Sequence, residues 1–460
     1  VAVTDLAAYF DDEITAMPNL VTVGAGGTAS TVAGIPFYSN TNSIYTHDVS
    51  ATDDGAENNI AYGKDSLIAI TTGDHNAALG YYALKKLTSG GKNISVGSFS
   101  GREILTAEDN VMVGYGAGAA ITTGDKNTAI GAQALGGANQ TGDGNVGIGY
   151  QALNLTTGDN NIAIGDRAAT QNTTGVRNIA IGYKAYGYSD TENDNLAIGY
   201  QAMTTNTAGG QYNVAIGNYS LDALTSGDEN TAVGYNALTA ATTGGKNTAI
   251  GYGALATQQT ANYNTAVGYD TLGDNTGGSA NTAVGYNSMA LNTTGSENVA
   301  LGFDALGGGV NTAQGNVAMG HSALKINTGG ANNVGVGRQA LVLNTTGASN
   351  VAIGSYSLDA NTTGAANVGI GKSTISTNTT GNYNTAVGHE ALKANTTAAD
   401  NVAVGHAALT ANTTGSKNTA IGKDALKANT TGTRNIAIGY QAYDASDTEN
   451  DNIAIGYQVM

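Results

Sequence analysis

The chain has 460 residues, of which 67 are Gly and two are Pro, and it contains neither Cys nor Trp. Its 41% hydrophobic content is too high for a disordered chain, and its formal net charge of −17 argues against a nucleic-acid partner, because phosphate binding relies on Lys and Arg. No run of about 18 apolar residues occurs, so the sequence predicts no membrane span.

Residues 1–58 stand apart from the rest of the chain in composition. Apolar residues recur at helical intervals over residues 4–17, which predicts a short helix there. Both prolines, Pro18 and Pro36, fall in this mixed region. Two interpretations stay open: the region docks the chain on an anchor at a virion or cell surface, or it caps the first coil of a repetitive region that begins at Asn59.

From Asn59 to the end, residues 59–460, the chain repeats a unit of 17 residues. The unit begins with Asn, a β-former, a small residue, an aliphatic residue and Gly, and it recurs 24 times with few departures from this spacing. The consensus N-[TVI]-A-[IV]-G-Y-x-A-L-x-x-N-T-T-G-x-x defines positions 1 to 17 of each coil. Such regularity is typical of a protein built by stacking one structural unit.

Each unit is too small to fold alone. Aliphatic residues at positions 2 and 4 alternate with period two, which predicts a short strand, and N-T-T-G at positions 12 to 15 is typical of a turn. Such a unit cannot bury its own apolar side, so the copies must stack. We therefore predict an all-β fold, a parallel β-solenoid of about 24 coils forming a rod on the order of 115 Å long.

Stacking turns each position of the repeat into a column. Position 4 is almost always aliphatic, and we expect this column to be the dry core. Position 3 is small except at Met112, and position 5 is always Gly, so either the opposite wall of the coil or a neighbouring chain packs closely there. The Asn column at position 1 predicts a ladder of side-chain amides.

The repeat also carries a family resemblance. NTAIG, NVAIG and NIAIGYQA resemble the left-handed parallel β-roll repeat of trimeric autotransporter adhesin heads, and NTAIGYxALxxNTTG resembles repeats of phage tail fibres. The resemblance covers residues 59–460 and implies a homotrimeric, surface-displayed fibre or adhesin. The resemblance has departures: autotransporters end in a stalk and a membrane-barrel anchor, and many such phage fibres end in a self-cleaving chaperone domain, whereas these 460 residues show the pattern of neither. Because the repeat stops short at Met460, we expect the natural chain to continue, to be cleaved there or to meet a partner.

A homotrimer also follows from the thinness of one coil. Each coil has only about four apolar positions, 2, 4, 8 and 9, and a single roll would leave part of them in water. Lateral packing of three copies would bury the remainder. The alternative is a single free-standing solenoid.

Position 6 supplies the first candidate site. It is Tyr in eleven coils, including four in succession: Tyr235, Tyr252, Tyr269 and Tyr286. Stacked phenols would suit a strip that binds a host glycan, because aromatic faces pack on sugar rings and hydroxyls bond to them. A structural ladder that shields the strands is the alternative.

His389 and His406 occupy the same column in adjacent coils, with Lys372 and Lys423 on either side. A metal bridging the two imidazoles is one hypothesis, and a solvated basic stripe is the other. Residue spacing indicates no catalytic constellation, so we expect neither an enzyme nor a bound cofactor.

Two turn motifs have alternative interpretations. NTT matches the glycosylation acceptor pattern, but turn geometry explains it better. Its Asn are Asn172, Asn292, Asn344, Asn361, Asn378, Asn395, Asn412 and Asn429. TGD turns carry Asp74, Asp125 and Asp159, yet the GGxGxD repeat of calcium β-rolls is absent, so a calcium role is unsupported.

A longer segment occurs twice, at residues 177–203 and 434–460, which indicates segmental duplication and argues against a unique active site there. The sequence as a whole predicts a structural fibre protein of a virion, tail or capsid, that projects or provides host-surface attachment. A bacterial trimeric surface adhesin is the alternative. An ice-binding solenoid is less favoured, because position 2 alternates irregularly between Thr and aliphatic residues.

Overall fold

The computed structural model describes residues 30–32, 35–40, 43–45, 54–137, 140–206, 209–445 and 447–459. These residues form strands, turns and bends, and none of them lies in a helix; the helix predicted over residues 4–17 falls outside the described ranges. Within these ranges no helix has the length and apolar character that crossing a bilayer requires. Backbone contacts divide the chain into unit 1, Val1–Tyr212, and unit 2, Asn213–Met460.

Unit 1 starts with antiparallel strands and continues as a parallel stack. β1 (Ser30–Val32) pairs antiparallel with β2 (Ile35–Asn40), which pairs antiparallel with β3 (Ser43–Tyr45). From β3 onward each strand pairs in parallel with the strand of the next coil, through β12. These strands are β4 (Ile60–Tyr62), β5 (Ala77–Leu79), β6 (Ile94–Val96), β7 (Val111–Val113), β8 (Thr128–Ile130), β9 (Val146–Ile148), β10 (Ile162–Ile164), β11 (Ile179–Ile181) and β12 (Leu196–Ile198).

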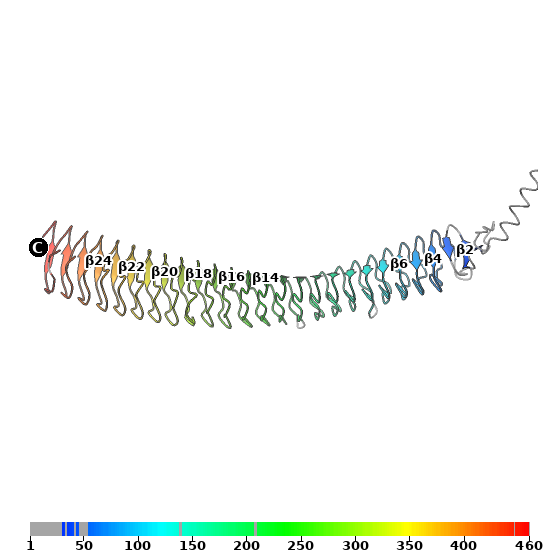
Figure 1. The fold of residues 1–460 in the computed structure, drawn as a ribbon, viewed down its shortest axis with the longest axis horizontal. Helices are drawn as coiled ribbons and strands as arrows, with labels where there is room; N and C mark the ends of the chain where they lie inside the picture. The colour runs from blue at the N-terminus through cyan, green and yellow to red at the C-terminus, as the bar shows by residue number, and fades with distance from the viewer. Residues whose placement is uncertain are drawn as a thin grey trace, which may run out of the picture. The chain divides into compact units, whose positions relative to one another are not determined.

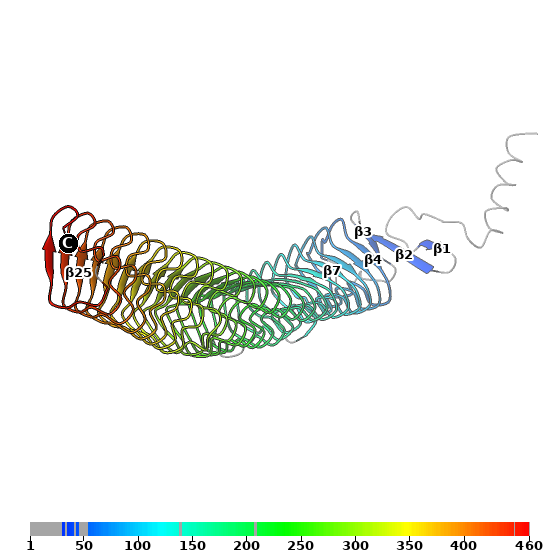
Figure 2. The ribbon, with the colours of Figure 1, turned by 60° about the vertical axis from the view of Figure 1, so that its left-hand side comes forward.

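Unit 2 is a parallel stack throughout, with successive strands side by side in chain order (Figures 1 and 2). Its strands are β13 (Val214–Ile216), β14 (Thr231–Val233), β15 (Thr248–Ile250), β16 (Thr265–Val267), β17 (Thr282–Val284), β18 (Val299–Leu301), β19 (Val317–Met319), β20 (Val334–Val336), β21 (Val351–Ile353), β22 (Val368–Ile370), β23 (Thr385–Val387), β24 (Val402–Val404), β25 (Thr419–Ile421), β26 (Ile436–Ile438) and β27 (Ile453–Ile455). The predicted all-β parallel β-solenoid is confirmed.

Left-handed backbone conformations close each coil. In the coil 418–434, Asp424, Leu426 and Arg434 have φ of 57°, 49° and 57°. L-residues adopt such angles rarely, and they persist here because the stacked neighbours fix the backbone. Position 5 has a stricter requirement: Gly422 has φ of +133°, and a Cβ there would lie 2.2 Å from the carbonyl oxygen of Gly439 in the next coil. The invariant Gly therefore reflects close approach of successive coils.

The core lies on the other face of the strand from the one we expected. Ala129 and Ala249 at position 3 are fully buried, whereas Ile130 and Ile250 at position 4 are 38% and 41% exposed. The prediction of a dry core at position 4 is wrong. Period-two alternation puts positions 2 and 4 on one face, and the coil is so narrow that only a small residue fits opposite the Leu of position 9.

Met112 shows how tightly this interior is filled. It is the one residue at position 3 that is neither Ala, Gly nor Ser, and it is fully buried. Position 9 is Gly101 in the preceding coil and Gly118 in its own coil, where most coils have Leu. A Cβ at either Gly would lie 2.7 to 2.8 Å from Met112 side-chain atoms. Met112 thus occupies the space that two missing leucine side chains leave.

The predicted amide ladder at position 1 is confirmed. The backbone N–H of Asn76 donates to Oδ1 of Asn59 at 2.8 Å, and Nδ2 of Asn76 donates to the carbonyl of Gly90 at 3.0 Å. Unit 2 repeats this arrangement, for example from Asn384 to Asn367 at 3.0 Å. Because these amides are buried, each bond satisfies a group that would otherwise destabilise the fold.

Candidate functional site

The position 6 column follows each strand immediately after the invariant Gly and points to solvent. Its four predicted tyrosines lie in unit 2 and are 43% to 51% exposed. Their backbones are held by the corner that the Gly makes, and by hydrogen bonds such as Asp270 N–H to the Tyr252 carbonyl at 2.9 Å. The stack therefore keeps each ring beside the ring of the next coil.

The structure brings these four rings together as one continuous stack. Centroids of Tyr235, Tyr252, Tyr269 and Tyr286 follow one another at 5.1 to 5.3 Å, with interplanar angles of 7° to 10°. Phe303 and His321 extend it, each 5.2 Å from its predecessor. The predicted site missed these two residues because it considered only Tyr, although the 17- and 18-residue spacing already placed them in the column.

Stacking limits what this column offers a ligand. Each interior ring has both faces turned toward neighbouring rings, so ring edges and phenol hydroxyls are what the column presents to solvent. Edges and hydroxyls suit hydrogen bonds to a polar ligand better than they suit packing against a sugar ring. Glycan binding by Tyr235, Tyr252, Tyr269 and Tyr286 stays a hypothesis, and their packing on one another supports the structural alternative as well.

His389 and His406 also stack, with centroids 5.3 Å apart and an interplanar angle of 18°. Lys393 donates to Oε1 of Glu390 at 2.7 Å, and this hydrogen bond, with a smaller contribution from the two imidazoles, holds the pKa of Glu390 below its usual range. An ionised carboxylate therefore lies beside the pair. In the described part of the chain, no three His, Cys, Asp or Glu side chains are grouped so that they could hold a metal ion.

The turn motifs have structural partners. Every Asn of the NTT motifs is fully buried. In the run from Asn344 to Asn429 each Nδ2 donates to Oδ1 of the preceding coil, beginning with Asn344 to Asn327 at 2.8 Å, as Asn378 does to Asn361 at 2.8 Å. The carboxylates of the TGD turns accept backbone N–H groups of the preceding coil; Asp125, for example, accepts from Glu108 at 2.8 Å. Both motifs therefore tie successive coils together.

The structure has a second exposed surface, which we call the outward strand face and which the sequence analysis did not predict. It consists of positions 2 and 4 of every strand, and within each unit its members are half-buried or exposed. Every residue at these positions is apolar, Thr or Tyr, and none is charged. The period-two alternation could have revealed this surface, because it requires positions 2 and 4 to share a side opposite the small position 3.

In comparisons with known proteins, no protein-family model and no curated protein matches the chain.

Proposed function

We propose that the chain is a structural fibre protein at the surface of a virion, where it projects or provides host attachment. The observation that supports this most directly is the buried amide ladder, which joins coil to coil within each unit alongside the strand hydrogen bonds. Such a ladder resists separation of coils along the stacking direction, as the shaft of a fibre requires. Residues 1–58 would carry the anchor to the virion or cell.

We further propose that three copies pack laterally through the outward strand face. The face is uncharged and largely aliphatic, and leaving such a face in water is unfavourable at about 25 cal/mol per Å² of apolar area. Positions 3 and 5, which first suggested close approach of a neighbouring chain, are occupied within the coil and do not contribute. Positions 2 and 4 are the ones that a partner copy would cover.

Light scattering on the purified chain tests the assembly. We expect a mass of three times 45.9 kDa, falling to 45.9 kDa when Ile250 and Ile353 are both replaced by Lys. These side chains are 41% and 40% exposed on the outward strand face, so Lys there would not enter the core of the coil. Thr346→Lys, at an exposed turn position, is the control and should leave the mass unchanged. A monomeric unmodified chain would remove the lateral-packing proposal.

The bacterial surface adhesin is the second candidate, since the same repeat resembles both kinds of protein. Antibodies against residues 54–460, used for gold labelling of the source culture in electron micrographs, separate the two. Label on released particles would support the virion fibre, and label on cell envelopes alone would replace it with the adhesin.

A further inference from the structure

The two copies of the duplicated segment differ in a way that points to a specific place. Residues 177–203 and 434–460 have the same residue at all but five positions. Two of the five exchange one apolar residue for another, Leu196 for Ile453 and Ala202 for Val459. The other three change the chemistry, and they are Lys184 for Gln441, Gly187 for Asp444 and Tyr188 for Ala445.

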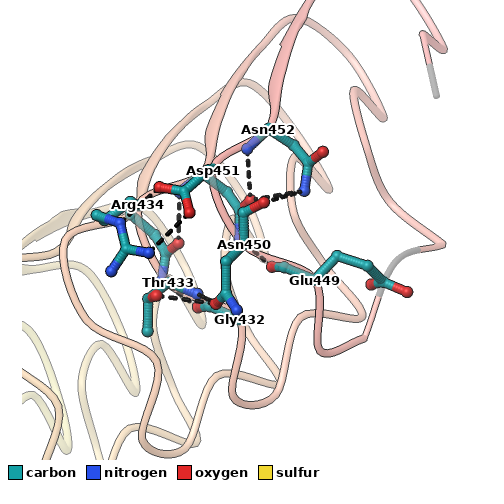
Figure 3. Close-up of polar contacts among 9 residues, drawn as sticks. Gly432, Thr433, Arg434, Glu449, Asn450, Asp451 and Asn452 are labelled. Carbon is teal, nitrogen blue, oxygen red and sulfur yellow. Dashed lines mark hydrogen bonds and ion pairs between the residues drawn. The ribbon is translucent and has the colours of Figure 1, made fainter.

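An ion pair and a backbone-to-Asn hydrogen bond of the segment recur in both copies. Figure 3 shows it in unit 2, where Arg434 pairs with Asp451 and Thr433 N–H donates to Oδ1 of Asn450 at 2.7 Å. The corresponding contacts in unit 1 join Arg177 to Asp194, and Val176 N–H to Asn193, also at 2.7 Å. The three changes are therefore not needed to maintain the coil.

All three changes fall on one cavity in unit 1. It has a volume of about 230 Å³, and Lys184, Gly187 and Tyr188 line it together with Gln151, Arg167 and Gln171. Gly187 leaves space beside Lys184. A Cβ at this position would lie 3.0 Å from the carbonyl oxygen of Lys184. The residues that distinguish the two copies are thus those that shape and charge this cavity.

The cavity places two cations side by side in a chain of strongly negative net charge. Arg167 and Lys184 occupy position 7 of adjacent coils, and Lys184 N–H bonds to the carbonyl of Asp166 at 3.0 Å. Arg167 has an ion pair with Asp166 only at 3.9 Å, and Lys184 lies 5.5 Å and 6.0 Å from the ring centres of Tyr183 and Tyr188. Like charges in neighbouring coils repel each other, and an anion between them would relieve this repulsion.

We propose that this cavity binds a sugar that carries a carboxylate. The guanidinium of Arg167 can hold a carboxylate through two hydrogen bonds, and Lys184 adds a second positive charge. The amides of Gln151 and Gln171 can bond to hydroxyls, and the ring of Tyr188 offers an apolar surface to the sugar ring. The volume suits a single sugar residue rather than a longer ligand in one piece.

Unit 2 provides the matched site that lacks this chemistry. There Asp424 stands where Arg167 does, and Gln441, Asp444 and Ala445 replace the three lining residues. Arg167, Lys184 and the ring of Tyr188 have no counterpart there, and two carboxylates are gained. Lys427 stands where Thr170 does, but it pairs with Asp424 at 3.1 Å. This inference deepens the proposed attachment function, and it rests on that function only in placing the sugar on a host surface. Binding of the sugar to the purified chain can be tested whether or not the chain attaches to a host.

The test titrates the full chain with glucuronate, glucose and inorganic phosphate by saturation-transfer NMR and calorimetry. Glucose has a hydroxymethyl group in place of the carboxylate, and phosphate is an anion without the sugar ring. We expect one glucuronate per chain and affinity for glucose or phosphate at least about ten-fold weaker, because each probe loses one set of charge-assisted or ring contacts.

The variant Lys184→Gln/Gly187→Asp/Tyr188→Ala gives unit 1 the residues of unit 2, which that coil already accommodates. It should keep the circular dichroism spectrum and melting curve of the unmodified chain and lose glucuronate binding by about ten-fold or more. Arg167→Gln should have the same effect. Failure of glucuronate to bind, equal binding of glucose or phosphate, or full retention of binding in the triple variant would each overturn the proposal. None of these results bears on whether the chain assembles as a fibre.

Discussion

Position 12 of the coil is filled in two opposite ways in the two units. Near the start of unit 1 it is Ile70, Leu87, Ile104 and Ile121, which form a buried aliphatic column. In the later coils of unit 2 it is Asn in every coil from Asn327 to Asn429, equally buried. The turn itself is the same: Leu87 N–H donates to Leu84 at 3.2 Å, and Asn361 N–H donates to Leu358 at 3.1 Å.

The difference teaches that stacking decides whether a polar side chain can replace an apolar one. A lone buried amide costs free energy because its groups lose water. In a column of amides each Nδ2 donates to the Oδ1 before it, so most of these groups are satisfied, as they are between Asn344, Asn361 and Asn378. The unit of stability is therefore the column rather than the residue.

The largest loss of stability should follow when an amide is placed in the aliphatic column of unit 1. Leu87→Asn puts an amide between Ile70 and Ile104, where no neighbouring amide can bond to it. We expect a loss of about 3–5 kcal/mol of local stability, from lost apolar burial and an unsatisfied amide together. Hydrogen exchange of residues 76–109 measures it.

Leu87→Ile is the matched control, because it keeps the volume and should cost less than about 1.5 kcal/mol. Equal protection in the two variants would contradict the view that an isolated amide is not tolerated here.

Placing an aliphatic side chain in the amide column of unit 2 should lower the stability somewhat less. Asn378→Leu removes the partner of both Asn361, 2.8 Å away, and Asn395, 2.8 Å away. The carbonyl of Gly381 keeps its bond from Asn367 at 2.8 Å. We therefore expect a loss of about 2–4 kcal/mol, mainly from Asn361 Oδ1.

Asn327→Leu tests this argument, because Asn327 takes part in a single ladder bond, from Asn344 at 2.8 Å. Its destabilisation in guanidinium melts should be about half that of Asn378→Leu. If both variants lose the same stability, the ladder bonds are not what stabilises the column.

A smaller effect on stability is expected from Asp359, whose side chain lies beside the amide column. Oδ1 of Asp359 is buried and has no hydrogen-bond partner among the described residues, and burial raises the pKa of Asp359 to about 6. The folded state therefore holds this proton more tightly than the unfolded chain, whose Asp has a pKa of about 3.9. The contribution of Asp359 to stability is greatest below pH about 4 and is lost as the pH rises toward 6.

Asp359→Asn removes this dependence. The variant should be more stable than the unmodified chain at pH 7 by about 1 kcal/mol, a value reduced for the partial exposure of the side chain. The difference should shrink between pH 6 and 4 in paired thermal melts. A constant difference across that range would show that the carboxyl does not titrate as its burial implies.

Much of the fold could be predicted because one unit recurs many times. The strand at positions 2 to 4, the turn at positions 12 to 15 and the amide ladder at position 1 all follow from residue types that recur at a constant spacing. Which face of the strand is buried did not follow from the sequence, because Ile130 and Ala129 are both compatible with a core. Only the width of the coil decides between them, and width depends on the residues of the opposite wall.

Of the candidate sites, the stacking of Tyr235 to Tyr286 and of the His389 and His406 pair was predictable, because a column at one residue per coil must stack. The cavity beside Lys184 was not, since it lies between two columns: Gln151, Arg167 and Lys184 share position 7, whereas Gln171 and Tyr188 share position 11. Their meeting depends on left-handed backbone angles, such as φ of 54° at Arg167. No spacing in the sequence reports these angles.

By itself the sequence determined that the chain stacks, how many coils the repeat contains and which columns are uniform, because these are properties of a period. The tertiary structure alone decided which face of each strand is buried, that Met112 fills the space above Gly101 and Gly118, and that positions 7 and 11 meet around one cavity. These depend on packing between residues of different coils and opposite walls, where shape and volume, rather than the order of residues, select the arrangement.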